Sequence, residues 1–212
     1  MTSISFDSLQ FRNNIAARFI ETGNYVQAYQ NLKMILRDAV ETVAQPEEST
    51  GPALTHSLDT TTLDINPRKD FDFFSWPVRV FDSSGSTEDD NDENTRTLCA
   101  VVLFNAGLAC HHLSRSTHQG VIRSNALLQA KDIYLRALSV AKRFGVILAL
   151  AVKANLMDIC LELGDLEGLQ YWRAQFNRQV TLHPTDMPDS VFLCFSAMSV
   201  YFAKGLVAAR AA

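Results

Sequence analysis

Three histidines and a cysteine come nearest, by type and spacing, to residues that could do metal or acid–base chemistry. His111 and His112 are adjacent, Cys110 precedes them, and His118 follows after a polar stretch. Adjacent side chains on a helix point about 100° apart, so the two neighbouring histidines cannot easily share one ion. No carboxylate lies at helical spacing from either of them. We therefore predict no metal site, with one histidine at the edge of the core and one in solvent.

Nucleophilic chemistry has equally little support. Sequence neighbours on a helix, such as Cys110 and His111, rarely form a nucleophile–base pair. The chain has no glycine-rich phosphate loop and no G-x-S-x-G motif. We predict that the protein is not an enzyme and uses no cofactor. An enzyme would need a titratable pair to meet in a pocket, and the candidates are His111 or His112 with Asp132, Asp158 or Cys160.

An asparagine motif offers binding chemistry instead. Asn14 is followed nine residues later by a Gly-Asn-Tyr turn, and Asn155 is followed nine residues later by Gly-Asp-Leu. A repeated turn at a fixed distance from the same polar residue is typical of stacked helical hairpins. A side-chain amide carries a donor and an acceptor, so it can bind both polar groups of a peptide backbone.

Helices must position these residues, because apolar residues recur every three or four positions outside 44–96. Gly23, Gly145 and Gly164 are predicted to end helices. We expect the helix over 98–113 to be the most buried, because it is apolar nearly all round. A polar connector is expected over 114–124. The predicted helices cover 7–22, 25–43, 98–113, 125–144, 146–163, 166–180 and a final stretch from Asp189 or Ser190 toward Arg210.

Residues 44–96 form an insertion of different character. Prolines, serines, threonines and an acidic run are concentrated there, whereas residues 71–81 are aromatic and β-branched. The latter predict a short strand that Pro77 interrupts. We expect the strand to be ordered and its flanks, near 46–58 and 83–95, to be mobile. The strand is either a plug that packs on the helices or a docking element for a partner.

The hairpins resemble tetratricopeptide repeats. In that family the first helix carries an Asn and a small residue, the turn carries Gly-Asp/Asn-Tyr, and the second helix carries small and large residues in alternation. The first match comprises Asn14, Ala16, Phe19, Gly23, Tyr25, Ala28, Leu32 and Ile35. The second comprises Asn105, Gly107, Ala130, Tyr134 and Ala137, and the third Asn155, Gly164 and Asp165. In the third, Leu169 and Phe176 replace the small residues.

This resemblance implies an all-α fold of antiparallel helical hairpins, stacked as a short array. It also implies that Asn14, Asn105 and Asn155 face a concave groove and bind a partner's peptide backbone there. The alternative is that each asparagine bonds a neighbouring helix or faces solvent. The family's lysine clamp for carboxylates does not carry over, because Asn13 stands where the first repeat needs Lys; Lys153 remains as a charge near the third hairpin.

A narrower likeness concerns a group of uncharacterised helical-repeat proteins abundant in diatoms, which brings no activity with it. The stretches that carry it are 76–80, 104–113 and 209–212.

Composition limits the cellular setting. The 212 residues are 47% apolar and 20% charged, which suits one soluble domain over 1–212. Four scattered cysteines in apolar segments are typical of buried thiols in a reducing compartment. A net charge of −4 argues against nucleic acid as a partner, and no signal peptide or long apolar run is evident. We expect a cytoplasmic or nuclear protein that does not bind membranes.

Two functions fit these observations. The first is an adaptor that binds a protein or peptide in a concave groove through Asn14, Asn105, Asn155 and Lys153. The second is a structural or assembly subunit, because the final helix is apolar on more than one side and terminal repeats normally need a polar outer face. The second function predicts a homo-oligomer or a permanent complex.

Overall fold

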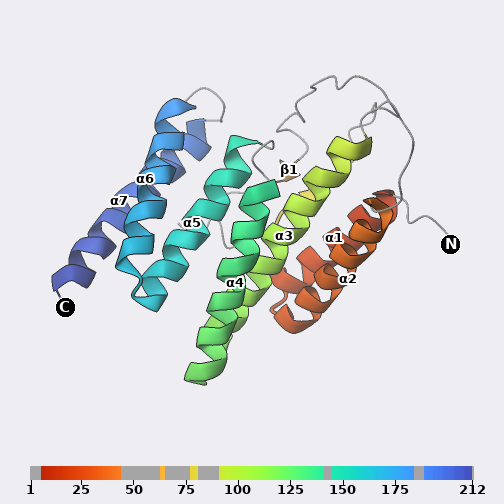
Figure 1. The fold of residues 1–212 in the computed structure, drawn as a ribbon, viewed down its shortest axis with the longest axis horizontal. Helices are drawn as coiled ribbons and strands as arrows, with labels where there is room; N and C mark the ends of the chain where they lie inside the picture. Colours follow the sequence, from red (N-terminus) through yellow and green to blue (C-terminus); the bar gives the residue numbers. More distant parts are fainter. Residues whose placement is uncertain are drawn as a thin grey trace.

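The computed structural model describes residues 6–43, 63–64, 77–80, 91–140, 145–183 and 189–211, and within these ranges the chain forms seven helices and two short strands. Each helix packs against its sequence neighbour in sequential antiparallel pairs, and Figure 1 shows them side by side in chain order. The helices are α1 (Phe6–Glu21), α2 (Tyr25–Val43), α3 (Asn91–Ser116), α4 (Gly120–Val140), α5 (Val146–Leu163), α6 (Leu166–Leu182) and α7 (Asp189–Ala211).

The turns after α1 and α5 have the same construction. Gly23 and Gly164 adopt positive φ angles of 81° and 70°, which a residue without a Cβ reaches at little cost. The next residue in each turn donates its N–H five residues back, from Asn24 to Phe19 O at 2.8 Å and from Asp165 to Cys160 O at 2.8 Å. This is the Schellman arrangement that closes a helix. The turns that the repeated motif predicts are confirmed.

The middle hairpin differs from the prediction. α3 continues to Ser116 and α4 begins at Gly120, so the connector is 117–119 rather than 114–124. Ser114 and Ser116 donate their hydroxyls to the carbonyls of residues three positions back, at 2.6 Å and 2.9 Å. Serines satisfied in this way do not stop a helix. Residues 141–144, expected at the end of the second helix, lie outside the described residues.

The start of α3 also lies earlier than expected. Residues 91–95 belong to the helix, although the sequence placed them in a mobile flank.

α3 is the central element of the fold. It packs against α1, α2, α4 and α5. Its segment Arg96–Ser116 is long and apolar enough to cross a membrane by length and composition, but most of it is buried by the other helices. The core helix of a globular domain has the same properties.

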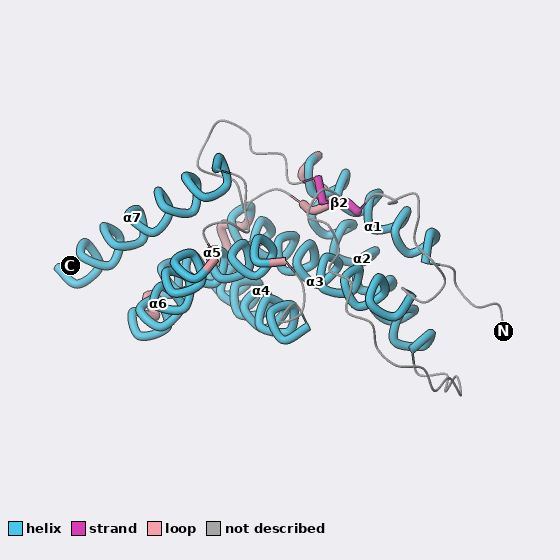
Figure 2. The backbone as a smooth tube through the Cα atoms, turned by 90° about the horizontal axis from the view of Figure 1, so that it is seen from above, coloured by secondary structure: helices cyan, strands magenta, loops and turns pink. Residues whose placement is uncertain are grey.

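Two short strands form a pair, one of which lies against the helices. β1 (Leu63–Asp64) pairs antiparallel with β2 (Arg79–Val80), with Leu63 opposite Val80. β2 packs on α1 and α3, and Figure 2 shows it beside α1. The strand predicted over 71–81 is thus described only for 77–80. Residues 71–76 and 81 lie outside the described residues, as do the expected mobile flanks 46–58 and 83–90.

α7 forms the C-terminal end and packs on α6 and α5. It begins at Asp189, one of the two predicted starting residues. Phe195 of α7 is fully buried against Phe176 of α6, with ring centroids 5.5 Å apart. Figure 2 shows the outer end of α7 extending away from the other helices.

Candidate binding site for an extended backbone

Two of the three motif asparagines bind the same short segment of the chain. Asn105 of α3 accepts the N–H of Val78 at 2.8 Å and donates to the carbonyl of Val78 at 2.8 Å. Asn14 of α1 does the same with Val80, at 3.1 Å and 2.9 Å. Each side-chain amide therefore uses its acceptor and its donor on one backbone residue.

The spacing of these contacts follows from strand geometry. Alternate residues of an extended chain direct their N–H and C=O to the same edge, about 6.6 Å apart at the usual rise. α1 and α3 are packed against each other, so their asparagines can meet residues i and i+2 of one segment. These contacts involve only backbone groups of the segment.

Two further amides complete what we call the amide cluster: Gln10, Asn13, Asn14 and Asn105. Gln10 donates to the carbonyl of Val80 at 2.9 Å, and Asn13 donates to that of Val78 at 3.3 Å. Asn13 also accepts from Asn105 at 3.0 Å, which fixes the orientation of the Asn105 amide. Gln10, Asn13 and Asn105 are buried, and buried amides contribute favourably only when their hydrogen bonds are made.

The side chains of the segment alternate between core and surface. Val78 and Val80 are 4% and 7% exposed and belong to the same apolar cluster as Leu9 of α1 and Leu98 of α3. Arg79 instead reaches Glu21 at the end of α1, with its Nη2 atom 2.7 Å from Oε1 and 2.5 Å from Oε2. The two side chains of this ion pair are only 27% and 29% exposed.

Asn155, the third motif asparagine, does not reach this segment. Its Nδ2 donates to the hydroxyl of Tyr134 at 3.1 Å between α5 and α4. Asn155 therefore follows the alternative expectation, in which the asparagine bonds a neighbouring helix.

Tyr134 also packs closely on α3. A Cβ at Gly107 would lie 2.7 Å from the Tyr134 ring, so glycine at this position allows the close contact.

Lys153 also has a partner elsewhere. It is half-buried in α5, its ammonium donates to the Gln179 side chain of α6, and desolvation lowers its pKa. The hydrogen bond of Lys153 therefore lies at the α5–α6 interface.

Gln10, Asn13 and Glu21 were not predicted as site residues. Gln10, Asn13 and Asn14 stand at positions i, i+3 and i+4, which places three amides on one helix face. That amide stripe was a usable signal, but we interpreted Asn13 only as a missing lysine. The sequence predicted that the segment 71–81 packs on the helices, but not that 77–80 is bound by these asparagines, since it lies more than sixty positions from Asn14.

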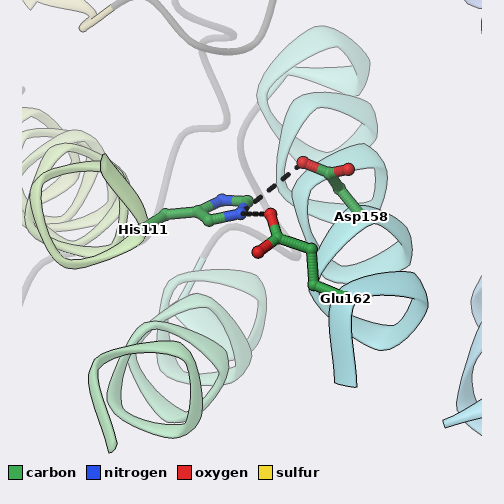
Figure 3. Close-up of side chains that lie close together, drawn as sticks. All are labelled: His111, Asp158 and Glu162. Atoms are coloured by element: carbon green, nitrogen blue, oxygen red, sulfur yellow. Dashed lines mark hydrogen bonds and ion pairs between the residues drawn. The ribbon is translucent and has the colours of Figure 1, made fainter. Parts of the chain in front are cut away.

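A second polar cluster involves His111. Its Nε2 lies 3.3 Å from Glu162 Oε1 and 3.5 Å from Asp158 Oδ2, and Figure 3 shows both carboxylates of α5 directed at the imidazole of α3. The three ligand atoms are within 4.8 Å of one another. Asp158 is one of the partners named above for a titratable pair with His111, whereas Glu162 was not predicted. Both carboxylates come from another helix, so spacing along α3 alone does not reveal them.

Two arginines neutralise these carboxylates. Arg115 donates to Glu162 at 3.0 Å and also pairs with Asp158, and Arg123 donates to the other oxygen of Glu162 at 3.0 Å. The hydrogen bond from His111 and those from the arginines lower the pKa of Glu162 to about 2. A metal ion here would have to displace guanidinium groups from the carboxylate oxygens. The cluster is therefore best described as an ion-pair network that joins α3, α4 and α5.

His112, His118 and the four cysteines have ordinary surroundings. His112 stacks on Tyr25 with ring centroids 5.1 Å apart, and His118 is exposed in the connector. All four cysteines are free, and burial raises the pKa of the Cys110 and Cys160 thiols to about 12 and about 11. Both are therefore protonated and poor nucleophiles at neutral pH.

Comparison of the chain with protein-family models, curated proteins and solved structures finds no match.

Proposed function

We propose that the protein is a non-enzymatic scaffold of tetratricopeptide-like hairpins that binds an extended polypeptide segment at the amide cluster. The observation that carries the proposal is the paired recognition of Val78 and Val80 by Asn105 and Asn14. Both backbone groups of two alternate residues are bound, and this pattern fits any extended peptide. A protein or peptide partner is thus favoured over nucleic acid, in agreement with the negative net charge.

The chain's own segment, 77–80, is the resident occupant of this site. Because it is tethered, it competes with a separate peptide at a high effective concentration. A partner gains access when the segment is released, and its apparent affinity falls with the fraction of chains that keep the segment bound. The network at His111 supports a scaffold rather than an enzyme, because arginines already occupy its carboxylates.

A variant that cannot occupy its own site tests the proposal. We define the emptied variant as the full chain with Val78→Pro, Arg79→Ala and Val80→Pro, which removes both N–H donors and the Arg79 charge. A fluorescent peptide with the sequence of residues 75–81 is expected to bind it, with binding followed by anisotropy. Circular dichroism checks that the helices are retained.

The same peptide should bind at least about tenfold more weakly when Asn14→Ala and Asn105→Ala are added, because four hydrogen bonds are lost at about 0.5–1.5 kcal/mol net each. Asn125→Ala, an exposed asparagine on α4, is the matched control and should leave binding unchanged. A folded emptied variant that does not bind the peptide would contradict the proposal.

One observation favours the second candidate, an assembly subunit. Leu193, Val200 and Tyr201 of α7 are 67%, 55% and 59% exposed. Positions i, i+7 and i+8 lie on one side of a helix, so these side chains form an apolar face. Multi-angle light scattering of the wild type and of Leu193→Glu separates the candidates. Concentration-dependent association that the substitution abolishes favours assembly, and a monomer at all concentrations favours the adaptor.

A further inference from the structure

We propose that the amide cluster selects extended segments in which a cationic residue stands between two β-branched apolar residues. This inference rests on the proposed function and adds the side-chain chemistry of the partner. The asparagines and Gln10 recognise the backbone alone, so selectivity has to come from what faces the side chains of the occupant. The resident segment shows those surroundings at three consecutive positions.

The two outer positions take apolar side chains. Val78 and Val80 lie in the core of the α1 and α3 region, at 4% and 7% exposure. A polar side chain at either position would be removed from water without a partner among these apolar neighbours. β-branched residues also favour the extended backbone that the asparagines require. The β-branched residues are valine, isoleucine and threonine. Of these, valine and isoleucine are apolar and therefore fit the surroundings of the two outer positions.

The central position takes a cation because of Glu21. Glu21 is the last residue of α1, where the negative end of the helix dipole disfavours a carboxylate. Among the described residues, Arg79 is the ion partner of Glu21, and the two side chains are partly exposed, at 27% and 29%. An occupant with a neutral or acidic central residue would leave Glu21 with an unfavourable interaction at the helix end. The carboxylate therefore discriminates between central residues of opposite charge.

A partner must also compete with the chain's own segment, 77–80, for this site. The resident segment carries the same valine–arginine–valine pattern, so a partner with the pattern replaces like with like. A partner without a cation loses the Glu21 contact, whereas the resident segment keeps it.

Three peptides and two proteins test the proposal. The first peptide has the sequence of residues 75–81, and the second carries Glu at the position of Arg79. The proteins are the emptied variant and the emptied variant with Glu21→Arg. We expect the emptied variant to bind the arginine peptide roughly five- to tenfold more tightly, as about 1 kcal/mol for a half-buried pair implies. Glu21→Arg should reverse the preference. A third peptide with Gly at both valine positions should bind neither protein.

The outcomes separate the two proposals. Equal affinity for the arginine and glutamate peptides would overturn the selectivity inference and leave the backbone-binding function standing. Absence of binding by both peptides to a folded emptied variant would overturn both.

A measurement that avoids the emptied variant covers the case in which it does not fold. In the otherwise unaltered chain, Arg79→Glu should speed amide hydrogen exchange at Val78 and Val80, because the segment now faces Glu21 with like charge. The double variant Arg79→Glu with Glu21→Arg should restore the slow exchange. Unchanged exchange in Arg79→Glu would show that Glu21 does not select charge.

Discussion

The chemistry of the candidate site at the residue scale is that of the primary amide. Asn14 and Asn105 each present one donor and one acceptor to one backbone residue, and Asn13 holds Asn105 in the required orientation. Asn105 is fully buried, whereas Asn14 is partly exposed. The two asparagines therefore make the same contacts in surroundings of different polarity, and this difference has a measurable consequence.

Asn105→Ala is expected to destabilise the protein by about 1–3 kcal/mol, because buried donors and acceptors lose their partners. Asn14→Ala should cost less, since water can reach part of its surroundings. Urea unfolding gives the two values, and Asn125→Ala on the surface of α4 should stay within about 0.5 kcal/mol of the wild type. A larger cost at Asn14 than at Asn105 would contradict this assignment.

Glu162 gives a prediction on pH. Its pKa is lowered to about 2 in the folded chain from an ordinary value of 4.5. A carboxyl with a depressed folded pKa contributes stability that is present above the unfolded pKa and is lost as pH falls toward the folded pKa. The free energy of unfolding should therefore fall between pH 4.5 and pH 2 through this group.

Glu162→Gln is the comparison for that pH dependence. It removes the titrating group, so the fall in stability between pH 4.5 and pH 2 should be shallower in the variant than in the wild type. Chemical unfolding at a series of pH values measures both slopes. Parallel slopes would mean that Glu162 has the same pKa in the folded and unfolded chain.

The elements of the fold show where sequence reasoning succeeds. The bounds of α2 and α5 agree with the predicted 25–43 and 146–163, because glycine turns and regular apolar spacing mark them. The connector between α3 and α4 was predicted too long. A helical segment that contains serines has the same polar composition as a loop, even when the serine hydroxyls bond within the helix. Local patterns thus determine helices, whereas hydroxyl hydrogen bonds decide whether a polar stretch remains helical.

The site was predictable in part for a related reason. The motif identified Asn14 and Asn105, because they repeat at equivalent places in their helices. It also included Asn155, whose different role depends on Tyr134 of another helix. The contact of His111 with Glu162 likewise joins different helices, and Asp158 was only one of several candidate partners for this histidine. Such pairings depend on packing between distant segments, which one sequence does not encode in any local pattern.

Packing between α3 and α4 yields a prediction with an internal control. An added Cβ at Gly107 would lie 2.7 Å and 2.8 Å from carbons of the fully buried Tyr134 ring. Gly107→Ala should therefore destabilise the fold by about 1–3 kcal/mol, because the ring must shift in a packed interior. Nothing lies within 4 Å of the corresponding position at Gly120, where α4 begins.

Gly120→Ala should consequently be neutral or stabilising by up to about 1 kcal/mol, since alanine loses less conformational entropy in a helix. Thermal melts of the two variants supply the comparison. Equal effects of the two substitutions would show that Tyr134 does not pack closely on Gly107.

At the scale of the whole molecule, an array of helical pairs binds a segment that belongs to neither of the helices it joins. Residues 77–80 bring α1 and α3 together through their backbone and through Val78 and Val80, while α5 to α7 form the other end of the row. The proposed function uses this contact twice, as a part of the fold and as a site for a partner. The second use requires that the site accept a segment that is not covalently attached.

The most direct measurement is nuclear magnetic resonance of the emptied variant with a ¹⁵N-labelled peptide of residues 75–81. The account predicts saturable binding, in which the peptide amides equivalent to Val78 and Val80 exchange slowly with solvent. The side-chain amide signals of Asn14 and Asn105 should shift with the same affinity, while that of Asn125 stays in place. A folded protein whose Asn14 and Asn105 signals do not move at saturating peptide would contradict the claim that the amide cluster binds extended polypeptides.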